Sequence, residues 1–261
     1  MNDIVRQILF YIVILLTNII QCITGFAGTV LAMPFSLMLV GYDVAKPILN
    51  VLGILASIGV IIFNYKSINL KEFLKIVLIM GSGMAIGILL IHYLDIDKQI
   101  LYFILAGIIL IFTIIGIYDN FIRKEEIENK EESIWNNILL YSILVASGVV
   151  HGMFVCGGPL LVLYASRKLK SRDEFRATLS LSWIVLNTII LITDISRGYF
   201  RSEVLPNMMI TLGISSIILV GAIIIGNIIA KKLERKPFLI ITFILMAISA
   251  VSLILNACGV M

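Results

Sequence analysis

Apolar stretches long enough to cross a membrane dominate this sequence, and they limit the folds open to it. Eight stretches, separated by charged or turn-rich gaps, cover roughly residues 4–40, 47–65, 73–91, 99–118, 134–165, 177–195, 204–230 and 237–257. A bilayer core about 30 Å thick needs about 20 apolar residues for each helix that crosses it. The chain is 60% hydrophobic and 14% charged, whereas a soluble domain is about 45–50% apolar and about 25% charged. We therefore expect an all-α polytopic membrane protein.

The same composition excludes several classes of protein. Disordered, collagen-like and soluble nucleic-acid-binding chains are far less apolar than this one. The net charge of +4 is small, and in a membrane protein basic residues mark topology. The three cysteines all lie in apolar stretches and give no disulfide framework.

Two of the apolar stretches, 4–40 and 134–165, do not have the length of a single span. Each contains a run rich in glycine, at 24–29 before Pro34 and at 151–159. Glycine favours departures from helical geometry, and proline starts a helix well but cannot continue one. Each stretch therefore predicts two shorter helices joined by an unwound link, and a kink in one tilted helix is the alternative. Unwound backbone at membrane depth occurs only inside protein or beside a watery cavity, so the breaks are a functional clue.

The two broken stretches hold matching places in two halves of the chain. Each half has one broken stretch followed by three ordinary ones. Residues 27–34 align with residues 156–163. With one more residue in the second loop, residues 46–50 align with residues 176–180, Ser57 aligns with Asn187 and Asn64 aligns with Asp194. We predict a first transmembrane repeat over 1–118, a charged cytoplasmic linker over 119–133 and a second repeat over 134–261. Repeats with interrupted segments point to the binding site of a transporter.

The distribution of lysine and arginine predicts how the halves are oriented. If each broken stretch returns to the side from which it came, five basic residues lie on one side and the other fifteen on the opposite side. The five are Arg6, Lys46, Lys98, Arg197 and Arg201. If each broken stretch crosses once, the split is nearly even, which does not follow the positive-inside rule. The returning arrangement gives each half an odd number of crossings, so the halves would be inverted repeats with both termini outside.

Two motifs at the breaks carry a resemblance to a known family. They are Gly25-Phe26-Ala27-Gly28-Thr29-Val30-Leu31-Ala32-Met33-Pro34 and Cys156-Gly157-Gly158-Pro159-Leu160-Leu161-Val162, with Arg176-Ala177-Thr178 and Ser180 further on. The first resembles the Gly-Phe-Gly-Gly-Gly, apolar, proline signature of the TauE/SafE membrane permeases, and the second resembles their Gly-Gly-Gly-Pro-Leu-Leu-Val signature. The third matches the family's element after the second hairpin. The resemblance covers nearly the whole chain.

The resemblance implies an anion permease. The family, which is also linked to 4-toluene sulfonate uptake permeases, is described as exporting or importing sulfite, organosulfonates and related anions. This chain departs from the pattern where Ala27 and Thr29 replace glycines of the first signature and Cys156 replaces one of the second. Leu163 stands where a second proline often sits. These departures lie near the presumed site, so they bear on the substrate more than on the fold.

The start of the second helix in each broken stretch is the predicted anion site. The first N–H groups of a helix lack partners, and the helix start carries roughly half a positive charge. Inverted halves would bring two such starts together at mid-membrane. The candidate substrate-binding residues are Gln21, Gly25, Gly28, Thr29, Asn50, His151, Cys156, Gly157, Gly158, Pro159, Thr178, Ser180 and Asn187, with Asn18 as a further lining group. For each polar side chain among them, a hydrogen bond between helices is the alternative.

The charged and reactive side chains near the breaks have two interpretations each, one functional and one structural. Lys46 and Arg176 occupy equivalent places, and as a charge funnel they would draw anions toward opposite mouths; snorkelling topology charges are the alternative. His151 can take a proton or bind a sulfur oxyanion, or it is a packed neutral ring. Cys22 and Cys156 are best explained as small apolar fillers.

Glycines in the later spans predict close contacts between helices. They are Gly81, Gly83, Gly87, Gly221 and Gly226. Without a side chain, glycine lets two helix backbones approach each other in the membrane.

A secondary transporter of small sulfur-containing anions is the function that these patterns favour. An accessory membrane subunit without transport of its own stays open, and so does an intramembrane enzyme with His151 and Cys156 as its only pair for nucleophilic catalysis. We expect no enzyme activity, no catalytic residue, no metal and no cofactor. The partners that we expect are the small anion, the lipid bilayer, a coupling H⁺ or Na⁺ and a second copy of the chain in a homodimer, but no nucleic acid. The expected location is multi-pass in a bacterial plasma membrane.

Overall fold

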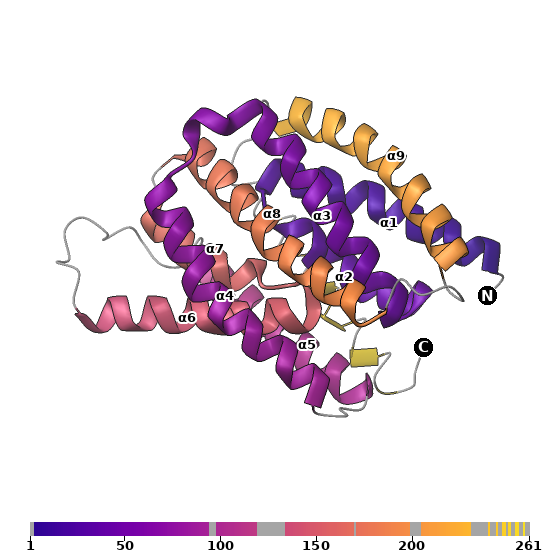
Figure 1. Ribbon diagram of the computed structural model, residues 1–261, viewed down its shortest axis with the longest axis horizontal. Helices are drawn as coiled ribbons and strands as arrows, with labels where there is room; N and C mark the ends of the chain where they lie inside the picture. Colours follow the sequence, from indigo (N-terminus) through magenta and orange to yellow (C-terminus); the bar gives the residue numbers. More distant parts are fainter. Residues whose placement is uncertain are drawn as a thin grey trace.

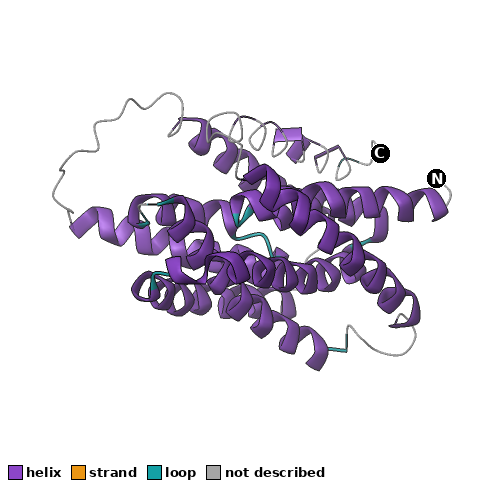
Figure 2. Ribbon diagram, turned by 90° about the horizontal axis from the view of Figure 1, so that it is seen from above, coloured by secondary structure: helices purple, strands orange, loops and turns teal. Residues whose placement is uncertain are grey.

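The described part of the chain is a bundle of α-helices without a strand (Figure 2). The computed structural model describes residues 3–93, 98–118, 134–169, 171–198 and 205–230, with scattered positions between 240 and 258. The elements in chain order are α1 (Asp3–Thr24), α2 (Ala27–Val40), α3 (Tyr42–Asn64), the short 3-10 helix η1 (Tyr65–Ser67), α4 (Leu70–Tyr93), α5 (Lys98–Ile117), α6 (Ile134–Phe154), α7 (Gly158–Lys168), α8 (Arg172–Ser196) and α9 (Leu205–Ala230). The predicted linker 119–133 and most of the predicted span 237–257 lie outside the described residues.

Within the described residues, six helices are long and apolar enough to cross a membrane. These spans are Ile4–Thr24, Tyr42–Ser67, Leu70–Tyr93, Asn137–Phe154, Arg172–Ser196 and Asn207–Ile229. Large apolar side chains on their outer faces are exposed, as at Leu78 and Ile217, which are 71% and 75% exposed. A surface of this kind belongs in lipid. The predicted all-α polytopic membrane fold is therefore confirmed.

Both long apolar stretches are broken, as predicted. The backbone leaves helical geometry at Gly25 and at Val155, whose φ angles are 83° and 58°. Each of these residues still donates its N–H to the helix it ends, Gly25 to Gln21 O and Val155 to His151 O, both at 2.7 Å. The second break is therefore shorter than predicted, because the helical hydrogen bonds of α6 extend past His151 to Phe154.

Each broken stretch folds back on itself. Helix α2 packs against α1, and α7 packs against α6. The turn between α1 and α2 is held by Trp183 on α8, whose Nε1 donates to Gly25 O at 2.9 Å. The two members of each pair therefore run in opposite directions, as the returning arrangement requires.

Helices in matching positions of the predicted halves make matching contacts. Helix α9 lies along α1 as α4 lies along α6, and α3 packs against α9 as α8 packs against α4. Helices α3 and α8, which match each other, lie side by side (Figure 1). The division into two repeats stays a prediction. Two equivalent repeats would make matching helix contacts of this kind.

Glycines set the closest helix contact, between α4 and α6. A Cβ atom on Gly83 or Gly87 would overlap a carbonyl oxygen of α6, and one on Gly148 or Gly152 would overlap a carbonyl oxygen of α4. Both helices thus carry a pair of glycines four residues apart, the spacing that lets helices touch in membranes.

Three of the five predicted packing glycines are confirmed. Gly83 and Gly87 make the contact just described, and a Cβ atom on Gly226 of α9 would lie 2.7 Å from Cys22 Cβ on α1. Gly81 is only loosely packed, with Leu186 Cδ2 at 3.8 Å. The prediction is wrong for Gly221, where a Cβ atom would meet nothing within 4 Å.

We expect Gly83→Ala and Gly148→Ala to destabilise the protein, because the added methyl group meets backbone that cannot rotate away. Overpacking of this kind costs about 1–3 kcal/mol. Gly213→Ala on α9 is the matched control, since nothing lies within 4 Å of its Cβ position. There alanine should be neutral or stabilise the helix by up to about 1 kcal/mol. Thermal unfolding in detergent measures both, and equal melting temperatures for all three variants would contradict the packing.

Candidate anion site at two helix starts

The starts of α2 and α7 meet in the interior of the bundle. A Cβ atom on Gly158 would lie 2.9 Å from Phe26 O. Cys156 Sγ donates a weak hydrogen bond to Thr29 O at 3.7 Å. The structure thus brings together the two glycine-rich breaks on which the sequence placed the anion site.

The start of α2 is closed by its own side chains. Thr24 Oγ1 accepts hydrogen bonds from the N–H groups of Phe26 and Ala27 at 3.2 and 3.1 Å. Gln21 Oε1 accepts from Gly28 N–H at 2.7 Å. Because these oxygens already occupy the first donors of the helix, an anion would have to displace them to bind there.

The start of α7 is open. Pro159 has no N–H group, and among the described residues the first α7 N–H group with an acceptor is that of Leu161, which donates to Gly157 O at 3.2 Å. Free N–H groups and the positive end of the helix dipole make such a start a site for anions. Gly157 and Gly158 also leave no side chain between this backbone and a ligand.

Gly157 is fixed by close packing as well as by its place in the break. Its carbonyl oxygen accepts a hydrogen bond from Ser147 Oγ at 2.7 Å. A Cβ atom here would overlap Ser147 O and would lie 2.8 Å from His151 Cβ. Any larger residue would therefore push the start of α7 away from α6.

Polar residues on facing sides of α3 and α8 continue the site. Lys46 Nζ lies 2.8 Å from Asp194 Oδ1, and Asn50 Nδ2 donates to Asn187 O at 3.0 Å. As the α3 number rises the α8 number falls, so the two helices run antiparallel. A Cβ atom on Gly53 would lie 2.9 Å from Asn187 Nδ2, which shows how closely the helices approach.

Several polar atoms on these faces are buried without a hydrogen-bond partner in the described part of the chain. They are Asn50 Oδ1, Ser57 Oγ, Ser180 Oγ and Asn187 Oδ1. A buried polar group without a partner costs about 1–3 kcal/mol. Such a group calls for an explanation, and a ligand or a bound water is one.

His151 lies beside these groups. Its ring centroid is 5.0 Å from that of Trp183, and the Asn187 amide is close to it. Neither ring nitrogen makes a hydrogen bond of good geometry among the described residues. The side chain is 1% exposed. His151 is thus a packed ring at the edge of the site, and its part in binding stays a prediction.

Comparison with models of protein families identifies the family of this chain. The model of the sulfite exporter TauE/SafE family matches residues 10–253. The chain belongs to the TauE/SafE family. No curated protein and no solved structure matches it. The family implies a membrane permease of the sulfur-anion exporter type, and its members are transporters rather than enzymes.

Some predicted site residues of this TauE/SafE protein make hydrogen bonds that hold the fold together. Thr178 Oγ1 accepts from the N–H of Asn69 at 3.0 Å, and Asn69 in turn holds the start of α4. Asn18 Nδ2 donates to Ile14 O at 2.8 Å within α1. Gln21 closes the start of α2. These three side chains are occupied where they are, whereas Thr29 is half-buried between α2 and α3.

Lys46 and Arg176 are both buried. Arg176 Nη2 donates to Cys22 O at 2.5 Å and to Asn227 Oδ1 at 3.2 Å, and its Nε has no partner in the described residues. Lys46 is paired with Asp194. Their part in drawing anions toward the mouths stays a prediction.

Sequence reasoning did not nominate Ser57, Trp183 or Asp194 for the site. The sequence nevertheless carried a signal, which is a spacing that alternates between four and three residues and marks one face of a helix. This spacing links positions 46, 50, 53 and 57 on α3, and positions 176, 180, 183 and 187 on α8. The polar residues on these two faces therefore share one interface.

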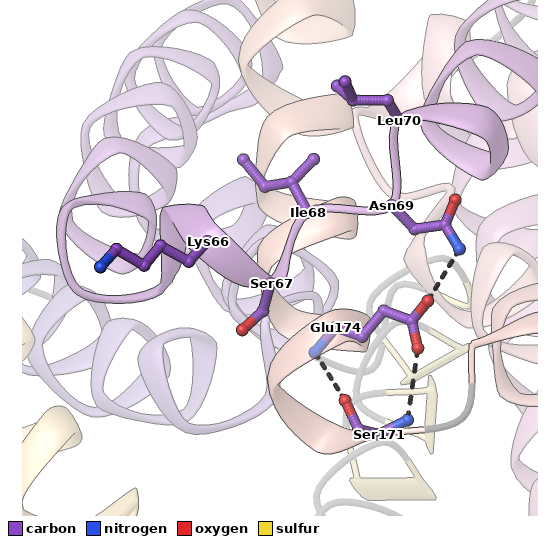
Figure 3. A pocket seen from close by; sticks show the side chains of 7 residues that line it. All are labelled: Lys66, Ser67, Ile68, Asn69, Leu70, Ser171 and Glu174. Atoms are coloured by element: carbon purple, nitrogen blue, oxygen red, sulfur yellow. Dashed lines mark hydrogen bonds between the residues drawn. The ribbon is translucent and has the colours of Figure 1, made fainter.

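A hollow of the described surface lies elsewhere. A pocket of about 600 Å³ is lined by Lys66, Ser67, Ile68, Asn69, Leu70, Ser171 and Glu174. Figure 3 shows Glu174 joined to Asn69 and to Ser171, with Lys66 pointing away from them. This network ties α8 to α4. None of the seven lining residues is a predicted site residue, although the Asn69 N–H also donates to Thr178 Oγ1. The described residues also hold no cluster of three or more His, Cys, Asp or Glu side chains for a metal ion.

We expect Thr24→Val to destabilise the protein by about 1–3 kcal/mol, because it leaves two buried N–H groups without an acceptor. Thr188→Val is the matched control. Thr188 is exposed and its hydroxyl donates only to Ile184 O of its own helix, so its loss should change stability little. Thermal unfolding in detergent measures the difference. Equal effects of the two substitutions would show that Thr24 does not hold the start of α2.

Proposed function

We propose that this TauE/SafE protein is a secondary transporter that moves small sulfur-containing anions, such as sulfite or sulfonates, across a bacterial plasma membrane. Family membership supports the permease class. The open start of α7, inside the bundle and beside buried polar groups, supports the substrate charge. This open helix start is the observation that carries the proposal.

Neutral groups at the start of α7 would contact the anion. The N–H groups of Gly157 and Gly158 have no acceptor among the described residues, and the half-buried Thr29 and the unpartnered Ser180 hydroxyl can donate further hydrogen bonds. Because Lys46 is paired with Asp194 before the anion enters, the site does not present an unpaired cation. This permits release, which a transporter requires at each cycle.

The arrangement of the halves supports alternating access. Helices α3 and α8 match each other in the sequence and run antiparallel in space, as two inverted repeats would. Transporters of this design bind substrate at the repeat interface and open to each side by moving one part against the other. Here the candidate anion site lies where both halves contribute residues.

Anion flux into sealed proteoliposomes tests the proposal. We expect flux of at least one sulfur oxyanion among sulfite, sulfoacetate and thiosulfate, and little flux of chloride. The assay is run with and without a pH gradient. No flux of any anion under either condition would contradict a stand-alone permease and would favour an accessory subunit, which should then co-purify with a partner.

We expect Ser180→Ala to raise KM for the transported anion roughly two- to tenfold without loss of stability. One hydrogen bond contributes about 0.5–1.5 kcal/mol, and the Ser180 hydroxyl has no partner among the described residues that the substitution would strand. Ser182→Ala is the matched control, because this equally buried hydroxyl donates to Thr178 O at 2.9 Å. Equal KM values for the two variants would remove Ser180 from the site.

A further inference from the structure

An ion pair buried in the bundle joins the two predicted halves. Lys46 Nζ on α3 and Asp194 Oδ1 on α8 are 2.8 Å apart, and their side chains are 3% and 1% exposed. Ionisable groups inside a membrane protein are costly and mark substrate or proton pathways. Replacing a buried pair by apolar residues often stabilises a protein, so stability alone does not account for the presence of this one.

The pair lies beside the break that opens α7. The Tyr42 ring lies 6.0 Å from Lys46 Nζ, and Tyr42 Oη donates to Met153 O at 2.6 Å. Met153 is in the last turn of α6, directly before the break. The positive charge of Lys46 also interacts electrostatically with the His151 ring. Tyr42 thus connects the surroundings of Lys46 with the last turn of α6, which directly precedes the break before α7.

Asp194 has a second oxygen that is not used by the ion pair. Oδ2 is buried and has no hydrogen-bond partner in the described part of the chain. An ionised carboxylate normally uses both oxygens when it is buried. The free oxygen is where a proton can add without first displacing another group.

Among the described residues, few titratable or charged groups lie near this pair. Tyr42 on α3 and His151 on α6 lie on the side of Lys46. Arg197, which directly follows α8, turns to α4, where its Nη2 donates to Ile88 O at 3.3 Å. The exposed groups at the same helix ends are Asp43 and His92. Lys46 is therefore the charge that most directly opposes protonation of Asp194.

We propose that Asp194 binds the proton that is coupled to transport, and that the substrate anion replaces its carboxylate as the counter-ion of Lys46. The proposal rests on the proposed function. In the step, a proton adds to Asp194 Oδ2, the contact between Lys46 Nζ and Asp194 Oδ1 breaks, and the anion pairs with Nζ while it accepts from the α7 N–H groups. Release of the anion and the proton restores the ion pair.

The charge of the site stays the same throughout this cycle. Before binding, one ammonium balances one carboxylate, and afterwards the ammonium balances one monovalent anion beside a neutral carboxylic acid. A monovalent anion should therefore move together with one proton, and its flux should not respond to the membrane potential. Breaking the ion pair also removes one of the contacts that hold α3 to α8, which links substrate binding to movement at this interface.

The test uses proteoliposomes and two assays, with radiolabelled methanesulfonate, whose single charge does not titrate near neutral pH, and sulfite in parallel. A gradient of one pH unit, alkaline inside, should drive about tenfold accumulation of methanesulfonate in the wild type, since one pH unit per coupled proton is equivalent to a tenfold ratio. In Asp194→Asn the accumulation should fall to no more than equilibration, while exchange of labelled for unlabelled anion persists. Asp43→Asn is the matched control and should behave as the wild type.

Each other outcome overturns the proposal. Gradient-driven accumulation that persists in Asp194→Asn shows that another residue carries the proton. Net uptake by the wild type that does not respond to the pH gradient shows that no proton is coupled, although the protein is still a permease. Wild-type liposomes that move neither anion and none of the other sulfur oxyanions overturn the proposed function, and this inference with it.

A measurement on the wild type covers the case in which Asp194→Asn does not fold. Dicyclohexylcarbodiimide reacts with protonated carboxyl groups within membranes, and mass spectrometry locates the adduct. We expect labelling of Asp194 to increase at acidic pH and to increase further when methanesulfonate or sulfite is added, because the anion stabilises the protonated state. Labelling that is unchanged or lowered by both anions would overturn the exchange of counter-ions.

Discussion

Backbone that leaves the helix inside a membrane must find other partners for its N–H and C=O groups, and this requirement organises the structure. Two breaks create the problem, and each lies against the other half of the chain. Gly25 O is satisfied by Trp183, and Met153 O by Tyr42. The donors at the start of α2 are satisfied by Thr24 and Gln21. Of the two helix starts at the breaks, that of α7 has first N–H groups without an acceptor among the described residues, and a ligand can complete the network there.

The two breaks are equivalent in sequence but different in chemistry. Thr24 and Gln21 close the first helix start, whereas the second begins with Gly157, Gly158 and Pro159 and has no side chain to close it. The basic residues near them differ in the same way. Lys46 has a carboxylate partner, while Arg176 donates to neutral oxygens of Cys22 and Asn227. A repeated fold can thus hold one structural break and one that is free to bind.

Local patterns in the sequence sufficed for the helices, the breaks and the meeting of the two helix starts. Glycine and proline mark a break wherever they stand, so these features needed no knowledge of the packing. The partner of a side chain on another helix depends on how the helices are turned and shifted. For this reason the pairing of Lys46 with Asp194 and the hydrogen bond between Thr178 and Asn69 were not foreseen. Val155 gave no signal because a β-branched residue rarely takes a positive φ.

The kind of contact between helices differs from one part of the bundle to another, and this determines which parts can move. Helices α4 and α6 touch through glycines, so their backbones lie in direct contact over Gly83, Gly87, Gly148 and Gly152. Sliding them would force carbonyl oxygens against Cα atoms. Helices α3 and α8 are joined instead by polar side chains, several of which have no partner. Rotating polar side chains costs less than separating interlocked backbones, and the new positions can offer the partners that are now missing. Movement should therefore occur at the contact of α3 with α8, where the candidate anion site also lies, while α4 and α6, which come from different predicted halves, move together as one unit.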